Sequence, residues 1–207
     1  GVAHLGAIFF LIAMVLAGWQ LKLTIHQRKI LRRGLAGLLL LNELLWHAWH
    51  IYHNIWTVQE LLPLELCSLM VFASAWTLIT KSQPVYEFVY LLGIPAATQI
   101  MFTPALGRYG FPHFLFIQQF VSHGCIILTA LYLTLGEHMR PRSWGAVARV
   151  AGLTMLYAVG IFILNFQLKS NYLFLAYKPP AETLIDYRGP WPWYGFSMAA
   201  IGLALAI

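Results

Sequence analysis

Seven long apolar runs follow one another along the chain, each close to the length that crosses a lipid bilayer. A helix needs about 20 apolar residues to span the hydrocarbon core, and it satisfies its own backbone hydrogen bonds there. The runs cover residues 4–23, 34–56, 61–80, 85–104, 115–135, 144–167 and 190–207. We therefore expect an all-α, seven-helix transmembrane bundle that forms a single transmembrane domain over residues 1–207.

The charged residues are distributed as in a membrane protein. Only 10% of the chain is charged and 60% is hydrophobic, whereas a soluble domain carries about 25% charged residues. The net charge of +6 could indicate nucleic-acid binding, but the basic residues lie in short connections between apolar runs. Membrane topology explains such a pattern, so we expect no nucleic-acid partner.

The basic residues also predict an orientation. If the runs alternate in direction, nine Lys and Arg residues fall on one side of the membrane and four on the other. The richer side is expected to be cytoplasmic, which puts the N-terminus outside and the end of the seventh run inside. The inner set is Lys22, Arg28, Lys29, Arg32, Arg33, Lys81, Arg140, Arg142 and Arg149. The outer set is Arg108, Lys169, Lys178 and Arg188.

Polar side chains within the runs concentrate in the expected outer half of the membrane. Ionisable groups in a span usually face a bundle interior or a cavity. In the second run, four residues spaced three or four apart form one helical stripe: Glu43, His47, His50 and Asn54. The third, fourth and fifth runs contribute Cys67, Gln99, Gln119 and His123. This asymmetry predicts a polar cavity open to the outer leaflet.

Cys67 is a candidate nucleophile if His123 contacts it. Both residues are expected about two turns below the outer ends of their helices. A neighbouring histidine can take the thiol proton and so activate the sulfur for acyl transfer. A cysteine without such a partner is more often a small core residue, which is our interpretation of Cys125.

These polar residues also have other interpretations. Glu43 and His47 could equally form a structural pair that fixes helix packing. The spacing of His47, His50 and His53 drifts around a helix, so we expect no metal site and no cofactor. A disulfide between Cys67 and Cys125 is not expected, because both lie within helices.

Five segments together resemble a known family. They read LPLELCSLM, GIPAATQIMFTP, FPHFLFIQQFVSHG, NYLFLAYKPP and DYRGPWPWY. As a set they are similar to the YwaF-like bacterial integral membrane proteins, which are related to animal transmembrane protein 164. The resemblance covers about two-thirds of the chain. It implies a seven-helix protein, a bacterial plasma-membrane location and a phospholipid acyltransferase activity that uses a Cys and a His.

Carried onto this sequence, the resemblance places the catalytic pair at Cys67 and His123. Glu65 departs from the family pattern, since bacterial relatives often have His two residues before the Cys. We expect Glu43, His47, His50, Gln99 and Gln119 to orient His123 or line the substrate site. We expect four residues of the last outer connection to meet a phospholipid head group: Asn171, Tyr172, Lys178 and Arg188.

The alternative function is lipid binding or transport without catalysis. A transport path needs polar groups through the whole membrane thickness, whereas here they concentrate in the outer half. A retinal-type receptor also has seven helices but needs a lysine in the seventh, and residues 190–207 contain none. Membrane phospholipids are the expected partners under either function.

Overall fold

The computed structural model describes residues 2–20, 23–103, 109–178, 190 and 193. Within them the secondary structure is entirely helical. The elements are α1 Val2–Gln20, α2 Ile25–Tyr52, α3 Leu66–Thr80, α4 Gln83–Phe88, a π turn Val89–Gly93, α5 Ile94–Phe102, α6 Phe114–Leu135, α7 Trp144–Leu168 and a 3₁₀ turn Tyr172–Phe174. Because α4, the π turn and α5 form one continuous helix, the described residues contain six helices.

Three of these helices are long and apolar enough to cross a membrane: Gln83–Phe102, Phe114–Leu135 and Trp144–Leu168. Two shorter stretches are also apolar helix, Val2–Val15 and Leu66–Thr80. Over the described residues the protein is therefore all-α with three candidate membrane spans. The expected seventh span, 190–207, lies outside the described residues except for 190 and 193, so the count of seven remains a prediction.

Two helix starts differ from the sequence-based expectation. Helix α2 begins at Ile25 rather than residue 34, because Thr24 and Gln27 form a capping box that starts the helix within the basic connection. Helix α3 begins at Leu66 rather than 61, and Glu65 is its N-cap residue. Pro63 thus lies before the helix and not in its first turn.

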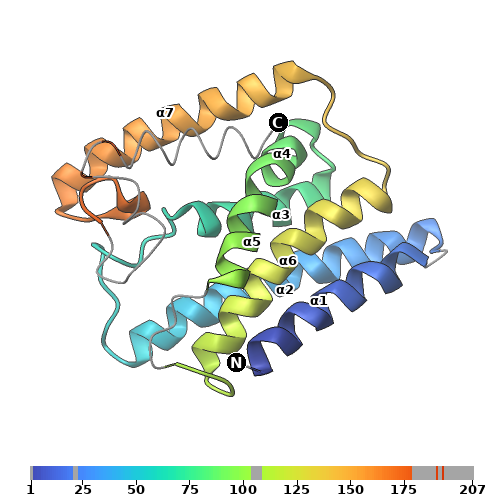
Figure 1. The fold of residues 1–207 in the computed structure, drawn as a ribbon, viewed down its shortest axis with the longest axis horizontal. Helices are drawn as coiled ribbons and strands as arrows, with labels where there is room; N and C mark the ends of the chain where they lie inside the picture. The colour runs from blue at the N-terminus through green and yellow to red at the C-terminus, as the bar shows by residue number, and fades with distance from the viewer. Residues whose placement is uncertain (1, 21–22, 104–108, 179–189, 191–192, 194–207) are drawn as a thin grey trace.

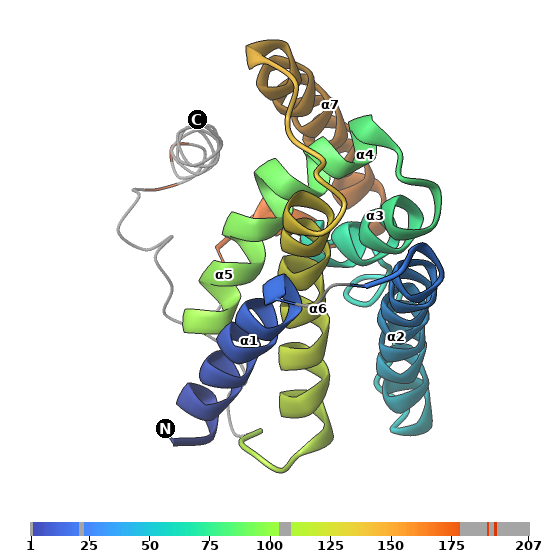
Figure 2. The same ribbon diagram turned by 90° about the vertical axis from the view of Figure 1, so that its right-hand side faces the viewer.

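Helix α6 is the central element of the bundle. It packs against α1, α2, α3 and α5, and Figures 1 and 2 show it between these helices. Its buried side chains include Ile126, Ala130 and Leu133, each 0% exposed. This burial matches its position, because a helix surrounded by others must be apolar on most of its faces.

The helix Gln83–Phe102 contains a π turn immediately before Pro95. Proline has no backbone N–H and its ring clashes with the preceding turn, and a π turn is a common way to accommodate such a disruption. The turn brings Gly93 against two neighbouring helices. A Cβ atom on Gly93 would lie 3.1 Å from Cγ2 of Ile126 on α6 and 3.4 Å from Sδ of Met70 on α3.

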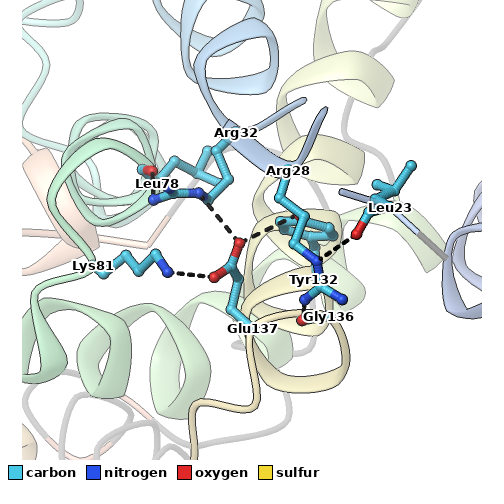
Figure 3. Close-up of polar contacts among 8 residues, drawn as sticks. All are labelled: Leu23, Arg28, Arg32, Leu78, Lys81, Tyr132, Gly136 and Glu137. Atoms are coloured by element: carbon cyan, nitrogen blue, oxygen red, sulfur yellow. Dashed lines mark hydrogen bonds and ion pairs between the residues drawn. The ribbon is translucent and has the colours of Figure 1, made fainter. Parts of the chain in front are cut away.

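A polar clasp joins the start of α2 to the ends of α3 and α6 (Figure 3). Glu137 forms ion pairs with Arg32, at 3.4 Å, and with Lys81. Arg32 also donates to the carbonyl of Leu78, and Arg28 donates to that of Gly136. Arginines suit these positions because the last carbonyls of a helix lack partners within it. The C-terminal ends of α3 and α6 therefore meet at this clasp.

Helix α7 lies at the edge of the bundle, as Figure 1 shows. At its first turns Arg149 pairs with Glu87 of α4, whose carboxylate is 0% exposed. Much of the remaining α7 surface is apolar and exposed, including Leu156 and Phe166. A lipid-facing surface explains this composition, because lipid does not penalise exposed hydrocarbon.

Candidate functional site

The segment that precedes Cys67 is held by residues from the far end of the chain. The hydroxyl of Tyr172 donates to the carbonyl of Val58 at 2.6 Å and accepts from the N–H of Leu62 at 2.8 Å. The hydroxyl of Tyr157 on α7 donates to the carbonyl of Leu64 at 2.7 Å. We call Tyr157 and Tyr172 the tyrosine clamp. It fixes the backbone that leads into α3.

The clamp is itself anchored at the end of α7. Asn165 donates to the carbonyl of Tyr172 and accepts from its N–H, both at 2.8 Å. Burial raises the pKa of Tyr172, so its hydroxyl keeps the proton that it donates to Val58. The N-cap residue Glu65 also joins this region, since its carboxyl oxygens accept from the N–H of Leu173 at 3.3 and 3.4 Å.

One ring nitrogen of His123 is hydrogen-bonded, and the other has no hydrogen-bond partner among the described residues. Its Nδ1 lies 2.7 Å from the carbonyl of Gln119, one turn earlier on α6. A carbonyl can only accept, so Nδ1 carries the proton and Nε2 has the free lone pair. The Nε2 atom is buried and has no hydrogen-bond partner among the described residues, so the thiol of Cys67 is not hydrogen-bonded to it. The free lone pair is the state that a general base requires.

Cys67 and His123 lie on α3 and α6, which pack against each other. Met70 on α3 and Ile126 on α6 meet at Gly93. Cys67 precedes Met70 by three residues, and His123 precedes Ile126 by three. Each residue therefore lies about 4.5 Å from this contact along its own helix, on the side away from the clasp.

Helix α2 supplies further polar groups to this region. Asn42 is buried and donates to the carbonyl of Gln118 on α6 at 3.1 Å. Glu43 is also buried, lies 3.7 Å from Nε2 of His47 and is hydrogen-bonded to the side chain of Ser68, the residue after Cys67. These contacts bring α2 against both α3 and α6 close to Cys67.

The sequence of the whole chain, residues 1–207, matches the TMEM164 family. This protein belongs to the TMEM164 family. The match extends beyond the two-thirds covered by the five motifs, and the narrower YwaF-like bacterial grouping remains a prediction. No curated protein and no solved structure matches the chain.

In this TMEM164-family protein, the expected stripe on α2 divides into two parts. Glu43 and His47 face each other, and Nδ1 of His47 accepts from Nε1 of Trp56 at 3.1 Å. His50 bonds instead to the carbonyl of Trp46 at 2.8 Å. Asn54 leaves the stripe because α2 ends at Tyr52.

The other expected site residues have different surroundings. Gln99 is exposed, because the π turn rotates the residues that follow it around the helix axis. Gln119 is half-buried and holds His123 through its carbonyl. The side chain of Asn171 bonds to the backbone of Ala176 and Tyr177. Lys178 is half-buried, and Arg188 lies outside the described residues.

Several contacts of this region were missed by sequence reasoning. Ser68 and Asn42 are polar residues within apolar runs, which is a usable signal, but their partners lie on other helices. Tyr157 gave no such signal, because a single tyrosine in an apolar run is ordinary.

Cys125 is buried with a free thiol, and the described residues contain no group of three or more potential metal ligands.

Proposed function

We propose that this protein is a membrane-embedded phospholipid acyltransferase with Cys67 as nucleophile and His123 as general base. The observation that carries the proposal is the shared contact at Gly93, from which each residue is offset by three positions towards the N-terminal end of its own helix. The free Nε2 of His123 supports the same roles. Family membership and the sequence resemblance agree with them.

The proposed reaction has two balanced steps. In the first, Nε2 of His123 takes the thiol proton while the sulfur of Cys67 attacks the carbonyl carbon of a phospholipid ester. The ester C–O bond breaks, the imidazolium returns its proton to the leaving alkoxide, and a thioester remains on Cys67. In the second step, His123 deprotonates the hydroxyl of an acceptor lipid. That oxygen attacks the thioester, and the thiol is restored.

Three buried polar atoms on three helices support the binding of a polar ligand here. They are Oε1 of Glu43 on α2, Oγ of Ser74 on α3 and Nε2 of His123 on α6. Ser74 lies two turns beyond Cys67 on the same face of α3. A buried polar atom without a hydrogen bond costs about 1–3 kcal/mol. A hydroxyl or water of a ligand can donate to Nε2 of His123 or to Oε1 of Glu43, whose ion-pair partner Nε2 of His47 is 3.7 Å away. The hydroxyl of Ser74 can donate to an ester oxygen.

The decisive experiment is detection of an acyl-enzyme on the purified full chain. A phospholipid with an isotope-labelled acyl chain should add one acyl mass to Cys67, and hydroxylamine should remove it as expected of a thioester. Cys67→Ala should abolish the adduct and the transfer of label. His123→Gln should slow transfer by about 10²–10⁴-fold.

Cys125→Ala is the matched control, because it removes the other thiol of the chain and should leave both signals intact. Full transfer activity in Cys67→Ala would show that the nucleophile is misassigned. The same orphaned polar atoms would then favour lipid binding or transport without catalysis.

A further inference from the structure

The end of the bundle that carries the clasp exposes positive charge only, within the described residues. Both of its carboxylates are buried: the side chain of Glu87 is 0% exposed and that of Glu137 is 6% exposed. Each is already engaged, Glu87 by Arg149 and Glu137 by Arg32 and Lys81. Four further cations at this end are exposed and have no ion pair in the described part of the chain: Lys29, Arg33, Arg140 and Arg142.

Two of these cations lie one turn apart on α2. Lys29 and Arg33 are four residues apart and therefore share a face. The start of α2 is fixed by its capping box and by the bond from Arg28 to the carbonyl of Gly136. Because this backbone is already fixed, a ligand that binds there orders little more than the side chains of Lys29 and Arg33.

The other two cations lie on the connection between α6 and α7, whose backbone is also fixed. Gln83 donates to the carbonyl of Arg140 at 2.8 Å, and the N–H of Arg142 donates to Glu87 at 3.2 Å. The hydroxyl of Tyr86 donates to the carbonyl of Met139 at 3.0 Å. These contacts hold the loop through its backbone. The guanidinium groups of Arg140 and Arg142 are therefore not needed to fix the loop and can contact a ligand.

Large apolar side chains are exposed beside these cations. Ile25 is 89% exposed and Trp144 is 69% exposed. Tryptophan is enriched where a protein meets the polar surface of a bilayer, and mixed basic and apolar surface is typical of membrane-surface binding. A lipid surface therefore fits both kinds of side chain, whereas a soluble anion would use the cations alone.

We propose that Lys29, Arg33, Arg140 and Arg142 form a binding surface for the anionic head groups of phospholipids in the adjacent leaflet. Each basic residue close to an anionic membrane surface contributes about fivefold to binding. The surface is separate from Cys67, which lies near the opposite end of α3 from Lys81. The inference is therefore independent of the proposed acyl transfer.

The test is native mass spectrometry of the full chain from micelles that contain equimolar phosphatidylglycerol and phosphatidylcholine. The wild-type protein should retain phosphatidylglycerol at least about fivefold over phosphatidylcholine. The variant Lys29→Gln/Arg33→Gln/Arg140→Gln/Arg142→Gln should lose most of this preference. Raising the salt concentration should weaken it as well, because exposed charges are screened.

Charge-conserving and opposite-end variants are the controls. Arg33→Lys/Arg140→Lys/Arg142→Lys should keep the preference, and so should Lys169→Gln at the other end of α7. If the fourfold variant unfolds at the same temperature as the wild type, its loss of lipid preference reflects lost binding and not lost folding. Equal retention of the two lipids by wild type, or an unchanged preference in the fourfold variant with native unfolding, would overturn the proposal. Complete displacement of lipid by soluble glycerol phosphate would overturn it too.

Discussion

Gly93 in the π turn and Ile126 on α6 are so close that a Cβ on Gly93 would lie 3.1 Å from Cγ2 of Ile126. Met70 of α3 is on the other side, with its Sδ 3.4 Å from the same position. Three helices therefore meet so closely that a side chain on Gly93 would have to displace its neighbours. The relative placement of α3 and α6, and with it that of Cys67 and His123, depends on this close approach.

Enlarging Gly93 should therefore destabilise the bundle and impair the proposed reaction. Gly93→Leu should lower the free energy of unfolding by about 1–3 kcal/mol, as overpacked cores do, and should reduce acyl transfer by separating α3 from α6. Thermal unfolding in detergent and the transfer assay measure the two effects. Gly152→Ala is the control, because nothing lies within 4 Å of its added Cβ. Wild-type unfolding of Gly93→Leu would contradict the packing argument.

Removing the hydroxyl of Tyr172 should loosen the segment before Cys67. Tyr172→Phe leaves the carbonyl of Val58 and the N–H of Leu62 without this partner, which should cost about 1–3 kcal/mol. Hydrogen exchange over residues 57–65 should become faster. Tyr177→Phe changes a 59% exposed side chain and should leave exchange unchanged. Equal exchange in both variants would mean that the clamp does not hold this segment.

Neutralising Glu137 should weaken the clasp at the basic end. Glu137→Gln removes a buried charge that pairs with Arg32 and Lys81. Because Lys81 is 45% exposed, we expect the free energy of unfolding to fall by about 1–2 kcal/mol, which is less than for a fully buried ion pair. Unfolding in urea-containing detergent measures the change. Glu60→Gln, an exposed carboxylate near the other end, should have almost no effect, and an equal loss in both would refute the clasp.

The orientation predicted from the basic residues can be tested by cysteine labelling. In the Cys67→Ala/Cys125→Ala background, a cysteine introduced at exposed His26 should resist a membrane-impermeant maleimide in intact cells. A cysteine at exposed Lys169 should react. The reverse pattern would invert the topology, and it would place the proposed acyl-transfer site towards the inner leaflet.

Several features could be predicted from the sequence because their causes are local. Apolar runs of about 20 residues indicate membrane helices, and the structure describes helices over six of the seven expected runs. The start of α2 could also have been predicted, since Thr24 and Gln27 have the spacing of a capping box. The surrounding basic residues favoured a loop instead, and the start was expected at residue 34. A proline inside a helical run indicates a disruption, and Pro95 does follow the π turn Val89–Gly93.

Other features depend on partners far away in the chain, and only the tertiary structure decided them. The turns of residues 58–65 that precede α3 are held by Tyr157 and Tyr172, which are 93 and 110 residues from their backbone partners Leu64 and Leu62. The exposure of Gln99 depends on one π turn, since a single inserted residue rotates every later side chain by about 100°.

The sequence by itself determined that this chain is a helical membrane protein with polar groups in its spans, because hydrophobic length and composition act residue by residue. It could place Cys67 and His123 at similar depth, but not on facing helices. That relationship was decided by the close approach of Met70, Gly93 and Ile126, since helix contacts arise from the shapes of surfaces that come together only in the folded chain.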